Sequence, residues 1–219
     1  MNPEVEIQEQ NLQIEDLSIR FATVSNMEAL FDALIKKGKD HADFKDERIP
    51  YWADLWPSAI GLSQHMVRHK LIKPGDRVLE LGCGLGLVGV VAGKMGAEVH
   101  FTDYIQDALD MASRNWDLND IPGEATFSIL DWREPAGNFQ PDWILAADVA
   151  YEKRILQPLL DTILHFKGPN TKVLLTEPGR QIGQAFFELL EKSELQTSDS
   201  SMIVKLKGIE TRVGIWEIG

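Results

Sequence analysis

A glycine-rich segment that starts with an acidic residue is the part of the sequence best suited to bind a ligand. Residues 80–89 read Glu-Leu-Gly-Cys-Gly-Leu-Gly-Leu-Val-Gly and lie between a predicted strand and a predicted helix. Glycines there let the chain turn tightly and let a ligand approach the main chain, while the free N–H groups at the start of the helix favour an anionic group. Gly84, Gly86 and Gly89 match the GxGxxG spacing of dinucleotide-binding proteins.

A second acidic residue follows at the end of the next predicted strand. Asp103 lies 19 residues after Gly84 and ends the β-type run 98–103. A carboxylate in that place can accept hydrogen bonds from ribose hydroxyls. We therefore predict an adenosine-containing ligand, for which NAD and S-adenosylmethionine are the two candidates.

Three features favour S-adenosylmethionine over NAD. Glu80 stands two residues before Gly82, where a carboxylate can meet the ammonium of an amino-acid moiety but would repel a pyrophosphate. Asp131 and Trp132 follow the third predicted strand and offer an acceptor for the adenine amino group beside an aromatic surface. A closing β-hairpin is foreign to the usual dinucleotide domain. An NAD-dependent oxidoreductase is disfavoured, because the sequence offers neither a convincing proton donor nor a second nucleotide-binding half.

The elements that must position these residues alternate from about residue 71 onward. The pattern predicts strands at 77–83, 98–103, 125–130, 143–149 and 172–176, and helices at 87–95, 108–118, 156–166 and 181–192. This alternation is typical of a doubly wound parallel sheet with helices on both faces. Two further runs, 202–207 and 211–218, are too close together for a crossover helix and predict an antiparallel hairpin. The fold class is therefore α/β, with a mostly parallel, seven-stranded, Rossmann-like sheet.

The first 70 residues are less regular. Two β-like runs fall within 5–24, helices are predicted at 26–37 and 58–69, and residues 40–55 read as an extended loop. No composition shift marks a boundary. We expect one domain over residues 1–219, with an N-terminal cap at 1–70 and a cofactor-binding core at 71–219.

Composition excludes several classes of protein. The 219 residues are 44% hydrophobic and 26% charged, which is typical of globular proteins rather than disordered ones. A net charge of −12 disfavours nucleic acid and anionic membranes as partners. The single cysteine, Cys83, excludes an internal disulfide and a multi-cysteine zinc site, and we predict no metal site. With neither a secretory signal pattern nor a membrane-length apolar run, we expect a soluble cytoplasmic protein.

Taken together, these motifs resemble those of the class I, seven-strand, S-adenosylmethionine-dependent methyltransferases. Residues 51–58 (YWADLWPS), 61–63 (GLS) and 147–151 (ADVAY) narrow the resemblance to methyltransferase family 16. That family contains protein-lysine methyltransferases of the methyltransferase-like group and their bacterial relatives. The resemblance extends from about residue 51 to residue 176.

The resemblance implies a role for individual residues. Asp148 and Tyr151 match the Asp-x-x-Tyr element of the family, at the end of the fourth predicted strand and beside the transferred methyl group, and are the expected catalytic residues. This sequence departs from the family at Cys83, where alanine or serine is common, and at Tyr104, where lysine-directed members often carry a basic residue. The cofactor is expected to be held by Trp56, Gly82, Cys83, Gly84, Asp103, Trp132 and Ala147.

The function that follows is methylation of a protein side-chain nitrogen, with lysine favoured, by a chain expected to be monomeric. Such a reaction needs no serine or cysteine nucleophile and no metal, because the cofactor carries the reactive group. Asp148 is a candidate proton acceptor, and Tyr151, Trp52 and Trp56 are candidates to surround a methylated ammonium. Two different functions stay open, a small-molecule N-methyltransferase and a non-catalytic cofactor-binding or interaction module.

Overall fold

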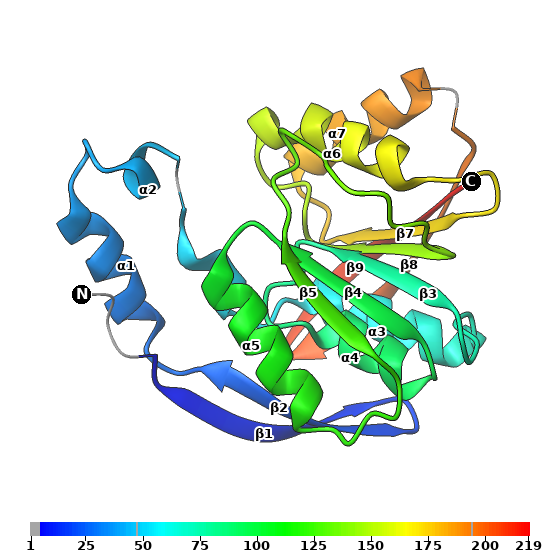
Figure 1. Cartoon of the computed structure of the whole chain (residues 1–219), viewed down its shortest axis with the longest axis horizontal. Helices are drawn as coiled ribbons and strands as arrows, with labels where there is room; N and C mark the ends of the chain where they lie inside the picture. The colour runs from blue at the N-terminus through cyan, green and yellow to red at the C-terminus, as the bar shows by residue number, and fades with distance from the viewer. Residues whose placement is uncertain (1–4, 47, 194) are drawn as a thin grey trace.

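A seven-stranded β-sheet forms the centre of the computed structural model, which describes residues 5–46, 48–193 and 195–219 (Figure 1). The strand order is β5-β4-β3-β6-β7-β9-β8. Five strands are parallel, and β9 runs antiparallel between β7 and β8. The predicted fold class is confirmed. The strands are β3 (Arg77–Leu81), β4 (Glu98–Asp103), β5 (Ala125–Ile129), β6 (Trp143–Ala147), β7 (Lys172–Glu177), β8 (Thr197–Leu206) and β9 (Ile209–Ile218).

Helices cover the sheet in two layers, visible above and below it in Figure 1. Alternate residues of β3 point to opposite layers: Val78 packs into one hydrophobic cluster, whereas Leu79 and Leu81 pack into the other. Within the described ranges, no helix combines the length and the apolar composition needed to cross a lipid bilayer. The first layer contains α3 (Pro57–His69), α4 (Leu87–Lys94) and α5 (Gln106–Asp117), and the second contains α6 (Lys153–Phe166) and α7 (Gln181–Lys192).

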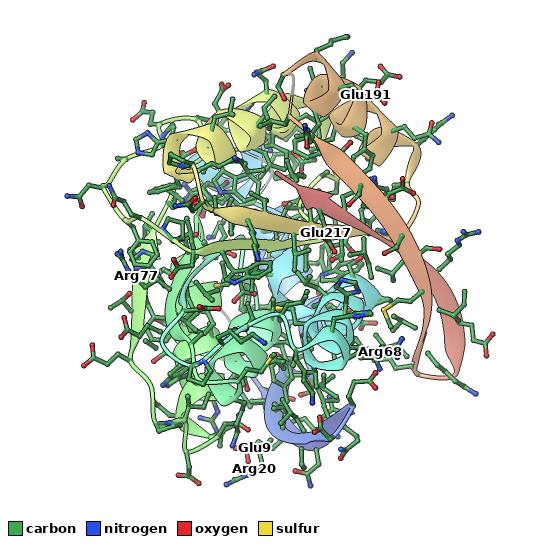
Figure 2. All side chains as sticks on the ribbon, turned by 90° about the vertical axis from the view of Figure 1, so that its right-hand side faces the viewer. Glu9, Arg20, Arg68, Arg77, Glu191 and Glu217 are labelled. Carbon is green, nitrogen blue, oxygen red and sulfur yellow. The ribbon has the colours of Figure 1, made fainter. Side chains whose placement is uncertain are left out.

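The N-terminal part adds a separate antiparallel hairpin and short helices. The hairpin, β1 (Ile7–Ile14) and β2 (Leu17–Val24), is followed by α1 (Met27–Lys37), α2 (Ala42–Lys45) and the 3-10 helix η1 (Pro50–Ala53). Asn115 of α5 fixes β2, because its side-chain oxygen accepts a hydrogen bond from the Ala22 N–H at 2.7 Å and its side-chain amide donates to the Ala22 carbonyl at 3.1 Å. In Figure 2, Glu9 and Arg20 of this hairpin project outward, and they form an ion pair of 3.3 Å.

The predicted N-terminal elements need two corrections. Residues 40–55 were expected to be an extended loop, but they contain α2 and η1. Helix α3 falls within the region predicted as the cap, yet it packs against α4 and against strands of the central sheet. A side chain at Gly61 would place its Cβ 3.1 Å from Val213 of β9, so the absence of a side chain allows this close packing. The prediction of one domain also includes residues 1–4, 47 and 194, which lie outside the described ranges.

The C-terminal hairpin is longer than predicted. The expected strand 202–207 begins five residues earlier, at Thr197, because a polar stretch pairs with β9 at the edge of the sheet. The expected three-residue connection is a two-residue turn, in which Lys207 and Gly208 have φ angles of 50° and 81°. Turns with two positive φ angles match the twist of antiparallel strands. Ile209 therefore pairs within β9 instead of belonging to the turn.

Candidate active site

A cavity of about 640 Å³ opens at the carboxyl ends of the parallel strands, beside the loop that follows β3. Strand β3 lies between β4 and β6, so the strand order reverses at this point, which is where open α/β sheets bind ligands. All of the predicted site residues line this cavity, although their roles toward a ligand remain predictions. They are Trp56, Glu80, Gly82, Cys83, Gly84, Asp103, Asp131, Trp132, Ala147, Asp148 and Tyr151.

Two glycines bring the loop after β3 and the start of α4 close to their neighbours. Gly86 has a φ of 77°, and a Cβ there would lie 2.7 Å from the Ala112 Cβ. A Cβ at Gly89 would lie only 2.3 Å from the ring of Phe101 and 2.5 Å from Glu80 Oε2. The missing side chains therefore allow α4 to begin directly against β3 and β4.

Glu80 is a buried carboxyl at the end of β3. It is 3% exposed, and its Oε2 accepts a hydrogen bond of 2.9 Å from the Gly89 N–H. Burial raises the pKa of Glu80 to about 8, the Gly89 N–H opposes this shift, and the Asp103 charge adds to it. The carboxyl therefore gains or loses a proton near neutral pH, and a cation placed in the cavity would favour the ionised form.

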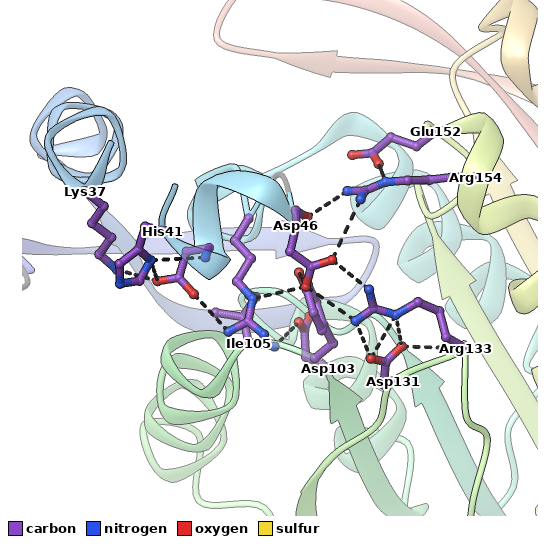
Figure 3. Close-up of polar contacts among 12 residues, drawn as sticks. Lys37, His41, Asp46, Asp103, Ile105, Asp131, Arg133, Glu152 and Arg154 are labelled. Atoms are coloured by element: carbon purple, nitrogen blue, oxygen red, sulfur yellow. Dashed lines mark hydrogen bonds and ion pairs between the residues drawn. The ribbon is translucent and has the colours of Figure 1, made fainter. Parts of the chain in front are cut away.

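Asp103 organises the loops on both sides of its strand end. Its Oδ2 accepts a hydrogen bond from the Gly84 N–H and its Oδ1 accepts one from the Ile105 N–H, each at 3.0 Å. Burial raises the pKa of Asp103, while the backbone hydrogen bonds oppose that shift. A carboxylate oxygen has two lone pairs, so each oxygen of Asp103 keeps one for a ribose hydroxyl. Figure 3 shows Asp103 next to Ile105.

An ion-pair network at the rim of the cavity was not predicted. Asp46, which precedes η1, accepts hydrogen bonds from Arg133 at 2.6 Å and from the Tyr104 hydroxyl at 3.0 Å (Figure 3). Burial of Asp46 disfavours its ionised form, but the bonds from Arg133 and Tyr104 lower its pKa overall. Arg133 also donates to both oxygens of Asp131 and lowers the pKa of that carboxyl. In the cavity, the carboxylate of Asp131 is therefore already paired with the guanidinium of Arg133.

Arg154 extends this network to the start of α6. It donates to the backbone carbonyl of Asp46 at 2.7 Å and to Glu152 at 2.7 Å. The segment before η1 is therefore tied to the loops after β4, β5 and β6. No local motif reveals the contacts of Asp46, because its partners lie 58 to 108 residues away in the sequence.

Asp148 lines the same cavity, directly after β6. Its φ of 61° is unusual for a residue with a side chain, and it is only 7% exposed. The Ser58 hydroxyl donates to its Oδ2 at 3.3 Å. Arg180, which the sequence reasoning missed, donates to both carboxylate oxygens. The predicted catalytic acid is therefore held in an ion pair.

Three aromatic rings lie together beside the ion pair of Asp148 and Arg180. Tyr51 meets the edges of Trp56 and Tyr151, with ring centroids 6.1 and 5.7 Å apart. Burial raises the pKa of the Tyr151 phenol, with a smaller contribution from the Glu152 charge, so this hydroxyl keeps its proton at neutral pH. Trp52 also lines the cavity. Aromatic faces in such a group can stabilise a methylated cation.

Among the described residues, the remaining chemistry-bearing groups do not form a second centre. Burial raises the pKa of the Cys83 thiol well above its ordinary value, which leaves it a poor nucleophile. Across the part of the chain that the structure describes, no group of three or more His, Cys, Asp or Glu residues could hold a metal ion. The pair of His65 and His69 on α3 faces Glu217, 3.6 Å from His65.

The mostly parallel sheet, its antiparallel β9 and the cavity at the point where the strand order reverses define a Rossmann-like methyltransferase fold. Solved structures with this fold include magnesium protoporphyrin IX methyltransferase from Synechocystis PCC 6803 with bound S-adenosylmethionine (TM-score 0.60, 16% identity, covering 89% of this chain and 92% of that one). A TehB-like S-adenosylmethionine-dependent methyltransferase from Corynebacterium glutamicum gives a TM-score of 0.55 at 18% identity, covering 82% and 98%.

The chain belongs to the lysine methyltransferase family, whose model matches residues 46–193. It is 36% identical to protein N-lysine methyltransferase METTL21A of Danio rerio, over 59% of this chain and 62% of that protein. It is 33% identical to histone-arginine methyltransferase METTL23 of Homo sapiens, over 55% and 66%. The chain thus spans about two thirds or less of the length of these curated relatives. The resemblance to methyltransferase family 16 is confirmed.

The residues of the cavity fit S-adenosylmethionine, the cofactor that this family implies. Glu80 is a buried carboxyl with a raised pKa, so the ammonium of an amino-acid moiety would stabilise its charge. Asp103 keeps lone pairs for ribose hydroxyls, and the ring of Trp132 lies beside Gly82. The cavity therefore contains partners for the ammonium and the ribose of the cofactor, and an aromatic surface beside them.

Proposed function

We propose that this protein transfers a methyl group from S-adenosylmethionine to a nitrogen of a protein side chain, with lysine as the favoured acceptor. One observation carries the proposal: the acid and glycine set of Glu80, Gly84 and Asp103 shares a single cavity with Asp148 and Tyr151. Family membership supports the reaction class, and METTL21A, named as a protein N-lysine methyltransferase, supports the acceptor.

In this proposal the chain binds and orients the cofactor, which supplies an activated methyl group. Glu80 holds the ammonium, Asp103 the ribose, and Asp131 the adenine amino group. Trp132 and Trp56 cover the flat parts of the ligand and exclude water. The loop 82–84 and Ala147 set the distance between the ligand and the ends of the strands. Fixing both reactants in this way removes much of the entropic barrier to an in-line displacement.

Asp148 and Tyr151 are proposed to place the acceptor nitrogen. They line the cavity together with the rings of Tyr51 and Trp56, which complete the surface. Each of the variants D148N and Y151F should lower turnover about tenfold or more while cofactor binding persists. Unchanged turnover in both variants would remove these two residues from the acceptor site.

The cofactor assignment is tested first, by calorimetric titration with S-adenosylmethionine, S-adenosylhomocysteine and NAD. We expect both adenosyl ligands to bind the wild type, NAD not to bind, and the variant D103A to bind the adenosyl ligands about a hundredfold more weakly. Arg212 provides a matched control because it lies on β9, where it contacts the Ser201 hydroxyl. The variant R212Q should bind like the wild type. Binding of NAD alone would overturn the proposed function.

The acceptor is tested by transfer of a tritiated methyl group from S-adenosylmethionine into a cell lysate. Label in the protein fraction, on lysine after hydrolysis, is the expected result. Label on arginine would favour the second candidate, because METTL23 is named as a histone-arginine methyltransferase. Label only in small molecules would replace a protein acceptor with a metabolite. Cofactor binding with no transfer to any fraction would favour a non-catalytic binding module.

We also propose that the chain acts as one domain and as a monomer in the cytoplasm, without nucleic-acid or membrane partners. The net charge of −12 supports the absence of polyanionic partners and favours encounter with basic protein acceptors. Light scattering of the purified protein tests the monomer, and a gel shift with RNA and DNA tests the expected absence of nucleic-acid binding.

A further inference from the structure

Arg180 lines the cavity beside Asp148 and Trp56, and it comes from the loop between β7 and α7. Its guanidinium pairs with both oxygens of Asp148 and lies over the ring of Trp56, 5.6 Å from the ring centre. The Asp148 side chain is 4% exposed and that of Arg180 is 34% exposed. The partly exposed side chain of Arg180 therefore covers the buried carboxylate of Asp148.

The structure fixes this pair from several sides. Glu177 Oε2 accepts hydrogen bonds from the N–H groups of Gly179 and Arg180, each at 2.8 Å, which sets the loop that carries the guanidinium. The Asp148 N–H donates to the Thr176 carbonyl at 2.8 Å. These bonds hold the backbone of both partners, so their pairing does not depend on flexible side chains alone.

The pairing matters because a methyl acceptor must present a free lone pair. A lysine-type amine arrives mostly as an ammonium ion, and an isolated carboxylate beside it would stabilise that unreactive form. With Arg180 in place, the charge of Asp148 is cancelled. Since both oxygens of Asp148 already accept bonds from Arg180, this carboxylate is also poorly placed to take a proton itself.

We propose that Arg180 is a positioning residue that neutralises Asp148, so that a cationic amine acceptor releases its proton to water and reacts near neutral pH. This inference rests on the proposed function. It gives Asp148 a role different from that of a proton acceptor: the pair shapes an electrically neutral, aromatic-lined entrance for the acceptor. The substrate class it selects is a primary amine on a flexible, cationic side chain.

Other ionisable groups near the pair are common to all the variants used below. Tyr51 faces Arg180, and burial is the main cause of the lowered pKa of that guanidinium, which as an arginine keeps its charge. Burial raises the pKa of Glu177 on β7. Glu80, whose pKa is raised by burial, is present in every variant, so only differences between profiles are interpreted. The groups around the neighbouring Tyr151 are Glu152, Asp103, Tyr104 and Arg154.

The test measures the pH dependence of methyl transfer into the lysate protein fraction that the wild type labels. The variants are R180Q, which removes the cation, R180K, which keeps it, and the double variant D148N/R180Q, which removes both charges. We expect the acid limb of the R180Q profile to move about one pH unit higher. In R180K and the double variant, the acid limb should stay near its wild-type pH, whatever the height of the profile. D148N alone, which leaves Arg180 uncompensated, should move the limb lower.

A second readout needs no acceptor and shows whether the variants fold. In R180Q, the buried Asp148 carboxyl binds a proton more tightly when the protein is folded than when it is unfolded. The melting temperature of R180Q should therefore fall as the pH rises from 5 to 8, relative to that of the double variant.

An R180Q profile of methyl transfer with unchanged shape, whatever its height, would overturn the inference, as would loss of the acid limb in D148N. If R180Q does not fold, the direction of the D148N shift decides between the same outcomes. Absence of transfer by the wild type would instead overturn the proposed function, on which the inference rests.

Discussion

The buried carboxyl of Glu80 makes cofactor binding depend on pH. At pH 7, a group with a pKa of about 8 is ionised in only about one tenth of the molecules, and at pH 6 in about one hundredth. If the ammonium of S-adenosylmethionine binds the ionised form, binding must release a proton. We therefore expect the dissociation constant to fall about tenfold between pH 6 and pH 7. This range lies below the usual pKa of an α-amino group, about 7.7–8.0, so the ligand stays cationic.

The variant E80Q isolates this effect. A glutamine keeps an oxygen to accept the Gly89 N–H but has no proton to release. Its affinity should be nearly constant between pH 6 and pH 7. Calorimetry in two buffers with different ionisation enthalpies would count the protons, with close to one released by the wild type at pH 7 and none by E80Q.

The same pKa has a consequence for the protein without cofactor. Because the folded-state pKa of Glu80 is raised above its ordinary value of 4.5, the folded state is penalised as pH rises from 4.5 to about 8. The free energy of unfolding of the wild type should therefore fall relative to that of E80Q by up to about 1.4 kcal/mol per pH unit in this range. Equal pH slopes for the two proteins, in both binding and unfolding, would refute the reasoning.

Three further predictions concern other parts of the site. The variant G89A places a Cβ 2.3 Å from the Phe101 ring and should lower the free energy of unfolding by about 1–3 kcal/mol, measured by urea denaturation. The variant D103A leaves the Gly84 N–H without its acceptor and removes the ribose contacts, so calorimetry should show affinity for S-adenosylmethionine reduced about a hundredfold. The variant D46N weakens a partly exposed network and should change stability by less than about 1 kcal/mol. Because the Asp46 network ties the segment before η1 to the rim of the cavity, D46N should nevertheless speed cofactor release in stopped-flow experiments. Added salt should speed release from the wild type in the same way. A wild-type release rate that does not depend on salt would contradict this role of the network.

The sequence predicted those parts of the fold that depend on local pattern. The alternation of apolar strands and amphipathic helices located β3, β4, β6 and β7 within one or two residues, because a buried parallel strand must be apolar along its whole length. The polar start of β8 carries no such signal. Residues 197–201 are polar and exposed, so they carry no apolar strand signal and the sequence pattern missed them.

The same distinction holds for the site. Glu80 and Asp103 were found because the end of each strand fixes their location, and Asp148 was found through the resemblance to methyltransferase family 16. Asp46 and Arg180 were missed because neither follows directly on a predicted strand end, and only the tertiary fold brings their segments to the cavity. Ion pairs over 87 and 32 residues of sequence leave no periodicity or motif by which a single sequence could reveal them.

The position of β9 constrains how the protein can fold during its synthesis. Strands β7 and β8 are both translated before β9. In the described sheet, β7 pairs with β6 on one side and with β9 on the other, whereas β8 pairs with β9 alone. Until that strand leaves the ribosome, the nascent chain carries an open parallel edge on β7 and an unpaired β8, and such edges readily pair with other chains. Slow translation near residue 209 would lengthen the time for which these edges are exposed. It would therefore increase aggregation of the nascent chain before the sheet is complete.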